Sequence, residues 1–443
     1  MKRWIVVLLV ALAVLVLISP GIIGRLAERS IEDGITVAEL ESPEITISTE
    51  SFDRGWFSSV GRHRIELSDR QTFPQAAKFA DESGYAGMPA LIIESRLDHG
   101  LVPVSSMTRE DGSLVPGIGK LVSTLQLDPG NGELIDLPAT VNSTIGLAGD
   151  TSGNIVVEPG EWSDRLNRLY WQRSEMQFDI DSRGELTLAR GFIEPMTIGT
   201  ADGEVEIGGI KLDLTQRAGP YDYALGSIDL FSGAVVSTDA YGNRGGYESL
   251  SIIADNDIDD DALLGSLKFD MTNISAPAVG NMNIAMHVSY AGFDAEAVAL
   301  LYDAYSERAQ TSDPQTALAS LYPEMEAELR QLLAGGGDLV FDKLNISIPQ
   351  GEIVSDLRLS LPEAGEGDAF SWPGLLLKMQ ASLNLQMPAD VFDMIVAMQP
   401  EARSAVAMGF LIPENGEYRM NVEYAQGLAT VNGLPMPIPL PGQ

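Results

Sequence analysis

Hydrophobic and polar residues alternate along most of the chain with a period of two, which is the pattern of β-strands. The clearest example covers residues 339–348 and 353–361, which we expect to form two strands joined by a tight turn at Pro349-Gln350-Gly351. Similar pairs are expected at 176–180 with 186–188 and at 205–207 with 210–214. Further strands are predicted at 267–271, 282–288, 418–424 and 428–430. A succession of hairpins favours antiparallel meander sheets over βαβ units.

Helical patterns are confined to three stretches. The pattern predicts a short helix at 72–82 and two helices within 293–334 that are broken at Ser312-Asp313-Pro314. It predicts a third helical region at 388–408, interrupted near Pro400. The predicted fold class is therefore mainly β (α+β), an elongated antiparallel β-meander assembly with a few helices. Because the strands alternate, each sheet is expected to have one covered and one open face.

A hydrophobic segment, residues 4–23, follows the basic residues Lys2 and Arg3. At 1.5 Å per residue it is roughly 30 Å long as a helix, which matches the hydrocarbon core of a bilayer. A cleaved signal peptide is the competing interpretation, but residues 19–24 contain no A-x-A site. We expect a single-pass protein of the bacterial inner membrane with a cytoplasmic N-terminus. The expected organisation is a membrane anchor (1–24), a β-rich periplasmic region (25–292), a helical segment (293–337) and a C-terminal β region with short helices (338–443).

Charge and cysteine content exclude several classes of function. The chain has 63 acidic and 28 basic residues, a formal net charge of −35. Nucleic-acid binding is not expected, because it depends on Lys and Arg neutralising phosphates. The absence of cysteine excludes disulfides, thiol nucleophiles, cysteine-ligated metals and an acylated lipoprotein anchor. The acidic residues between 255 and 261 lack the glycine and terminal glutamate of an EF-hand, so we expect a solvated loop and no cofactor.

Candidate site residues occur in two short segments. Arg54-Gly55-Trp56-Phe57 is the most distinctive, and it is interpreted either as a strand bend whose aromatics pack on the sheet or as a binding site. Asp98-His99-Gly100 follows a predicted strand, where Asp and His point to opposite faces and a structural turn is the default interpretation. His63 and His287 have no partner motif. Serine-hydrolase and phosphate-loop motifs are absent.

These segments, together with the N-terminal hydrophobic stretch and the C-terminal run from Gly416 to Asn432-Gly433, resemble the YdgA-like family of bacterial proteins. One departure is Leu101-Val102-Pro103, which stands where many members have a proline directly after His-Gly. The resemblance implies an inner-membrane anchor and a periplasmic domain. The family has no established activity, so the resemblance assigns no catalytic residues.

Three functional hypotheses follow. The first is a non-enzymatic envelope protein that binds a lipid or another envelope protein, because one-face-apolar strands accompany a membrane anchor. The second is an oligomeric structural or assembly factor that associates through strand edges and apolar helices. The third is a hydrolase of envelope polymers that uses paired carboxylates. We favour a non-enzymatic role.

Overall fold

The structure is a computed structural model that describes two compact units separately, an N-terminal unit (residues 1–201) and a C-terminal unit (residues 202–443). The described residues are 45–67, 90–99, 118–128, 134–163, 168–200, 202–276, 280–309, 325–362, 374 and 377–436. The segments 4–23 and 72–82 lie outside them. In the described residues, none of the helices is long and apolar enough to cross a membrane.

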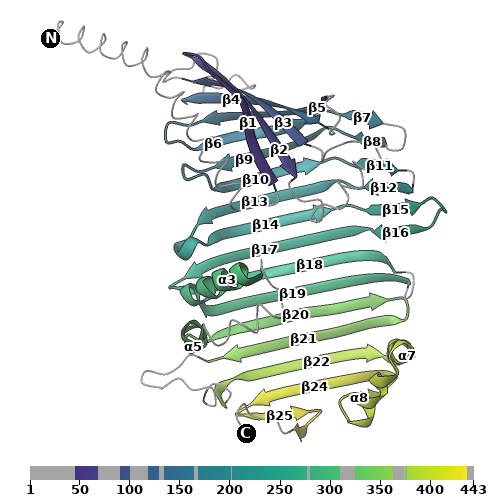
Figure 1. Cartoon of the computed structure of the whole chain (residues 1–443). Helices are drawn as coiled ribbons and strands as arrows, with labels where there is room; N and C mark the ends of the chain where they lie inside the picture. Colours follow the sequence, from purple (N-terminus) through teal and green to yellow (C-terminus); the bar gives the residue numbers. More distant parts are fainter. Residues whose placement is uncertain are drawn as a thin grey trace, which may run out of the picture. The chain divides into compact units, whose positions relative to one another are not determined.

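The N-terminal unit contains a meander of antiparallel strands (Figure 1). Hydrogen-bonded neighbours follow the order β1 (Ile45–Arg54), β2 (Ser58–Leu67), β3 (Ala90–His99), β4 (Gly119–Asp128), β5 (Ile135–Ile145), β6 (Thr151–Val157), β9 (Ser174–Ile180) and β10 (Leu186–Ile193). A second group pairs β7 (Gly160–Ser163) with β8 (Arg168–Trp171) and β8 with β11 (Met196–Thr200). The predicted pairing of 176–180 with 186–188 is confirmed, since Ile180 is opposite Leu186.

The C-terminal unit is a longer antiparallel meander. Its neighbours run β13 (Ile210–Ala218), β14 (Ala224–Ser232), β17 (Ser249–Asp259), β18 (Ala262–Ala276), β19 (Gly280–Asp294), β20 (Gly337–Ile348), β21 (Gly351–Leu361), β22 (Gln380–Pro388), β24 (Glu417–Ala425), β25 (Leu428–Val431) and β26 (Leu434–Met436). β23 (Ile412–Glu414) pairs with the start of β24, and β12 (Gly203–Ile207), β15 (Val235–Asp239) and β16 (Arg244–Tyr247) form a separate group. The expectation of a mainly β, antiparallel fold with few helices is confirmed.

One predicted hairpin is wrong. Residues 205–207 do not pair with 210–214, because Val205 lies opposite Ser237 while Leu212 lies opposite Leu230. The chain passes from one sheet to the other at Gly208-Gly209, and its partner does so at Gly233-Ala234, because the register of β12 with β15 continues into that of β13 with β14. The Gly208 N–H donates to the Ala234 carbonyl at 2.6 Å, where a Cβ on Gly208 would be 2.7 Å from a backbone atom. The glycines therefore permit a close approach of two paired backbones where both change sheets, rather than a turn.

The acidic segment 255–261 is also not a loop. Its first residues belong to β17, and the turn to β18 is formed by Asp260 and Asp261, which have φ angles of 46° and 66°. Two consecutive positive φ values are the backbone of the tight hairpin turns that suit the strand twist, and Asp tolerates them.

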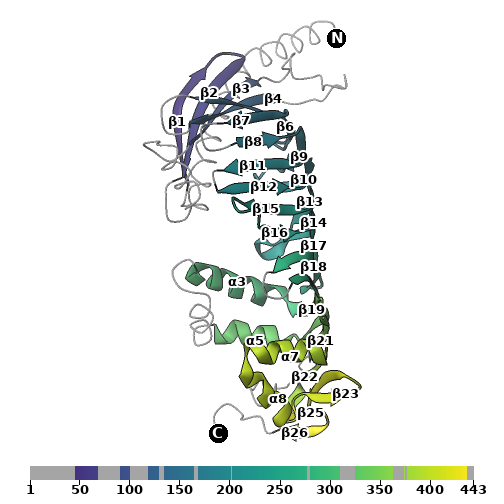
Figure 2. The same ribbon diagram turned by 90° about the vertical axis from the view of Figure 1, so that its right-hand side faces the viewer.

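The described helices belong to the C-terminal unit. They are α3 (Ala295–Ala309), α5 (Glu326–Ala334), α7 (Ala389–Met398) and α8 (Arg403–Ala407), with the short 3₁₀ turns η1 (Pro220–Asp222) and η2 (Pro400–Ala402). Figure 2 shows α3, α5, α7 and α8 on one side of this unit's sheet. The predicted interruption of 388–408 near Pro400 is confirmed by the break between α7 and α8.

The buried core of the C-terminal unit lies beneath α7. Phe392 and Val396 pack with Met387 and Leu411, and partly buried side chains from β21, β22 and β24 surround them. The Phe392 ring lies 4.2 Å from that of Tyr418, centroid to centroid. The helix thus covers only one end of the sheet.

Candidate functional site

The segment Arg54-Gly55-Trp56-Phe57 forms the turn between β1 and β2. Its Gly55 N–H donates to the Ser58 carbonyl at 2.8 Å, and a Cβ on Gly55 would approach that oxygen to 2.6 Å, so the turn requires glycine. Trp56 and Phe57 are 57% and 59% exposed. The expected bend at a glycine is confirmed, but the expected packing of its aromatics on the sheet is wrong, because both residues present more than half of their surface to solvent.

The structure brings this turn together with His99. The His99 N–H donates to the Phe57 carbonyl at 2.9 Å, and its Nε2 is hydrogen-bonded to Ser59 Oγ at 3.0 Å. Both side chains are 1% exposed. On β4 the residue opposite His99 is Gly119. The imidazole is therefore buried against Ser59 of β2, while the His99 backbone N–H holds the end of β3 against the aromatic turn.

Asp98 does not complete a catalytic arrangement with this pair. It is opposite Ser58, points to the other sheet face, and accepts a hydrogen bond from Arg96 at 3.2 Å. A serine and a histidine in contact resemble a nucleophile with its general base, but a nucleophile must be reachable by substrate. Because Ser59 and His99 are both buried, their hydrogen bond is interpreted as a structural link between β2 and β3. Gly100 lies outside the described residues.

Ser59 is the residue of this hydrogen-bonded pair that the sequence prediction missed. The signal was the alternation of Ser59, Gly61 and His63, which are all buried on one face of β2. His63 Nδ1 is hydrogen-bonded to Thr49 Oγ1 at 3.1 Å, and burial lowers the pKa of the His63 imidazole. Polar groups with partners thus replace aliphatic packing along this part of the strand.

Asn432 and Gly433 form the tight turn between β25 and β26. Both have positive φ angles, 51° and 78°. Asn432 Oδ1 accepts from the Asn421 N–H at 2.8 Å, while its Nδ2 donates to the carbonyls of Gly409 and Phe410 at 2.8 and 3.1 Å. One amide side chain therefore joins the end of the sheet to the segment after α8, which is a structural role.

The largest feature without an evident structural role is one face of the C-terminal sheet, called the apolar face below. Hydrogen-bonded register places hydrophobic residues opposite one another across nine neighbouring strands: Leu214, Ile228, Ala254, Leu267, Val288, Phe341, Leu357, Leu383 and Val422. A parallel row consists of Leu212, Leu230, Ile252, Phe269, Met286 and Leu344. No charged residue interrupts either row.

Most of this face is only partly covered. No residue of the two rows is buried, and Leu344 remains 41% exposed. The α7 helix lies on the same side, where it packs on Ile353, Leu385 and Met420 toward the C-terminal end of the meander. These sheet residues beneath α7 are likewise only partly buried, and the more exposed Leu344 and Ile346 mark hydrophobic surface that is open to solvent.

The opposite face is polar. Across the same strands the register aligns Asp213, Asp229, Ile253, Lys268, His287 and Lys343. His287 Nε2 lies 3.1 Å from Asp270 Oδ2, on this polar face. In the part of the chain that the structure describes, no group of three or more acidic or histidine side chains is arranged to hold a metal ion.

Fold and surface thus define a class of protein: a predominantly antiparallel meander with an open apolar sheet face. Comparison of sequences places the chain more specifically. Residues 1–439 match the family described as "Bacterial protein of unknown function (DUF945)", and the chain belongs to this family. It is also similar to Protein YdgA of Escherichia coli (strain K12), with 25% identity over 173 residues. That match covers 37% of this chain and 32% of YdgA. The YdgA-like resemblance is thereby confirmed. No solved structure matches the chain significantly.

Proposed function

We propose that this protein is a cell-envelope protein, anchored in the bacterial inner membrane by residues 4–23, that binds the acyl chain of a lipid on its apolar face. The observation that carries the proposal is the unbroken row of partly exposed hydrophobic residues from Leu214 to Val422. Hydrophobic residues in register on one face, without a covering layer, are expected where a ligand completes the layer.

The dimensions of the row suit a hydrocarbon chain. Nine strands at about 4.8 Å spacing extend over roughly 40 Å. One leaflet contributes about half of a hydrocarbon core of roughly 30 Å, so an extended acyl chain fits within this length. Covering apolar surface contributes about 25 cal/mol per Å². The row itself is uncharged, so the net charge of −35 disfavours anionic headgroups but not the contact with the acyl chain.

The same surface supports a second candidate, an interface with an envelope protein or with a second copy of this chain. Leu344 and Ile346 lie two positions apart on the same face of β20, and they are 41% and 36% exposed, as expected at an interface before it forms. The two candidates differ in what covers the face, and one experiment separates them. The hydrolase alternative stays a hypothesis, because it is not tied to a particular pair of carboxylates.

The test is native mass spectrometry of the full chain, with extraction and quantification of co-purified lipid, combined with light scattering for mass in solution. Leu344→Glu places a charge on the apolar face. Ile253→Glu is the matched control, since Ile253 is also 41% exposed but lies on the polar face. Lipid at defined stoichiometry in the wild type and in Ile253→Glu, reduced several-fold in Leu344→Glu, is the expected result.

Two other outcomes would contradict lipid binding on the apolar face. Absence of bound lipid from the wild type, with an oligomer that Leu344→Glu converts to a monomer, would assign the face to a second copy. Equal lipid content in both variants would show that lipid binds elsewhere. Thermal unfolding of each variant verifies that the fold is retained.

A further inference from the structure

A tyrosine hydroxyl without a partner lies on the apolar face of the C-terminal sheet. Tyr290 of β19 is two positions beyond Val288, so both side chains are on the same face. The Tyr290 hydroxyl forms no hydrogen bond with any residue that the structure describes, and its oxygen is open to solvent. A ligand that covers this part of the face must offer an acceptor, because burying an unpaired hydroxyl group is unfavourable.

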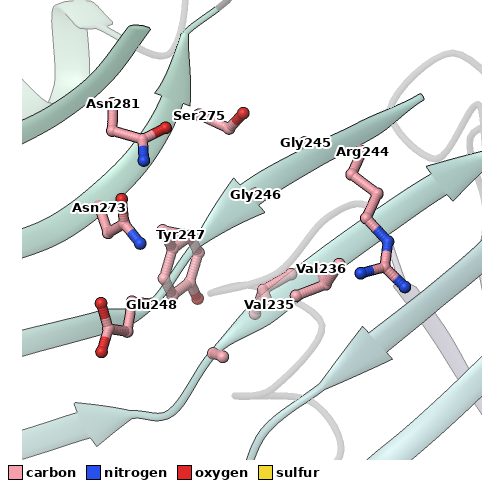
Figure 3. A pocket seen from close by; sticks show the side chains of 11 residues that line it. Val235, Val236, Arg244, Gly245, Gly246, Tyr247, Glu248, Asn273, Ser275 and Asn281 are labelled. Atoms are coloured by element: carbon pink, nitrogen blue, oxygen red, sulfur yellow. The ribbon is translucent and has the colours of Figure 1, made fainter.

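Two other tyrosines of this unit use their hydroxyls within the fold. Tyr223 Oη donates to the Ala295 carbonyl at 3.0 Å. The ring of Tyr247 lines a pocket of about 350 Å³ between β16 and the adjoining ends of β18 and β19 (Figure 3), and its Oη lies 3.2 Å from Ser232 Oγ. Tyr290 differs from both, since its hydroxyl is available to a ligand.

Gly265 sets the position of the Tyr290 ring. The two residues are opposite each other in the register of β18 with β19. A Cβ on Gly265 would lie 2.5 Å from Tyr290 Oη and 2.7 Å from its Cζ. The absence of a side chain therefore allows the ring to lie across β18, with the hydroxyl directly above Gly265.

The row of side chains that contains Tyr290 carries no charge. It is adjacent to the row from Leu214 to Val422, because each of its members is two positions away from a member of that row. Hydrogen-bonded register aligns Gln216, Gly226, Asn256, Gly265, Tyr290, Leu339, Leu359, Ala381 and Tyr424. An ionised headgroup placed in this row would therefore find no counter-ion within it.

The charge near Tyr290 favours an uncharged acceptor. Burial raises the pKa of the Tyr290 hydroxyl, and the negative charge of Asp255 raises it further. The hydroxyl thus stays protonated at neutral pH and can donate. Because the same negative charge repels anions, a carboxylate or phosphate is disfavoured beside the hydroxyl, whereas an ester carbonyl needs only one donor.

The distance from Tyr290 to the more exposed part of the face suits an acyl chain. Leu344 lies on the neighbouring strand β20, two rows away from the row of Tyr290, and Ile346 lies one row further. Rows two residues apart are separated by about 6.8 Å, so Leu344 is roughly 14 Å from the row of Tyr290. One leaflet of a bilayer contributes about 15 Å of hydrocarbon, so one chain can reach both places.

We propose that the Tyr290 hydroxyl donates a hydrogen bond to the ester carbonyl of an acyl lipid whose chain lies along β19 and β20 toward Leu344. The protein then selects esterified acyl chains over free fatty acids. This inference rests on the proposed function, because it requires an acyl chain on the apolar face.

The test compares two ligands that differ in the carbonyl alone, 1-palmitoylglycerol and its ether analogue 1-hexadecylglycerol. Each is titrated into the full chain, and binding is measured by native mass spectrometry in one detergent. The wild type is expected to bind the ester roughly three- to tenfold more tightly than the ether. Tyr290→Phe should bind the two equally, whereas Leu344→Glu should weaken both alike. The matched control is Tyr302→Phe on α3, where the side chain is 66% exposed, and it should keep the wild-type ratio.

Two further measurements report on the carbonyl and on charge. Infrared spectra of the ester labelled with ¹³C at its carbonyl should show a lower stretching frequency in the wild-type complex than in the Tyr290→Phe complex, because a hydrogen bond weakens the C=O bond. Palmitate, at a pH where it is ionised, should bind the wild type more weakly than 1-palmitoylglycerol.

The outcomes separate this inference from the proposed function. If neither glyceride binds the wild type, both are overturned. If both glycerides bind and the ester-to-ether ratio is the same in Tyr290→Phe, the role of Tyr290 is overturned while acyl-chain binding stands. Tighter binding of palmitate than of the ester would overturn the selection of esters. Should Tyr290→Phe fail to fold, the wild-type spectrum decides, since an unshifted carbonyl frequency would exclude the hydrogen bond.

Discussion

Ser59 Oγ and His99 Nε2 lie 3.0 Å apart, and each side chain is only 1% exposed although the aromatic residues two and three positions before Ser59 are open to solvent. This hydrogen bond joins β2 to the last residue of β3. It also explains why the two segments singled out by the sequence, around Trp56 and around His99, belong to one structural feature.

The contribution of this bond to stability is directly testable. Ser59→Ala leaves a buried imidazole nitrogen without its hydroxyl partner, and such a loss costs about 1–3 kcal/mol. We expect a corresponding decrease in the free energy of unfolding, measured by urea denaturation with tryptophan fluorescence. Ser48→Ala on the exposed side of β1 is the control. An equal effect of the two substitutions would contradict a specific role for the bond.

His63 is expected to make the N-terminal unit less stable in weak acid. Burial lowers its pKa in the folded state below the value of 6.5. Below pH 6.5 the unfolded chain therefore binds the proton more strongly, and stability falls until the lower folded-state pKa is reached. Above pH 6.5 the residue contributes no pH dependence.

His63→Gln keeps a side chain able to bond Thr49 but cannot titrate. We expect the difference in unfolding free energy between pH 7.5 and pH 5.5 to be smaller in His63→Gln than in the wild type. Carboxylates that titrate lower in the range act on both proteins alike, so the comparison isolates the histidine. An unchanged difference would remove His63 as the cause.

The small core under α7 is predicted to stabilise the C-terminal end of the meander. Phe392 is 5% exposed and contacts the Tyr418 ring, so Phe392→Ala should cost about 3–5 kcal/mol. Met398, on the same helix and 56% exposed, provides the control as Met398→Ala. Hydrogen exchange of the β21, β22 and β24 amides measures the effect locally. Exchange that stays slow in Phe392→Ala would show that α7 is dispensable for the sheet.

Asn432 tests the interpretation of the C-terminal motif as a structural junction. Asn432→Asp replaces the Nδ2 donor with an oxygen facing the carbonyls of Gly409 and Phe410, which should cost about 1–3 kcal/mol in the unfolding free energy. Asn432→Gly retains the positive φ but loses the side-chain bonds, so it separates conformation from hydrogen bonding. Thermal unfolding of both variants gives the comparison, and an undisturbed Asn432→Asp would refute the junction.

The sequence by itself determined the strand content, most hairpins and the break at Pro400. These features depend on local alternation, turn residues and proline geometry, which act over a few positions. The sequence also identified the segments around Trp56, His99 and Asn432 as distinctive, but it could not assign them partners. Locally, Gly208-Gly209 had the composition of a hairpin turn, and its role in the close approach of two paired strands depends on Ala234, far along the chain.

Only the tertiary structure decided how these elements combine. Pairing of Ser59 with His99 requires the register of β2 against β3, which alternation alone does not fix, because a slip of one residue would reverse the face of every side chain. The apolar face likewise depends on the register of nine strands, and its openness depends on where α7 packs. Local sequence determines which residues are hydrophobic, whereas long-range packing determines which of them stay uncovered.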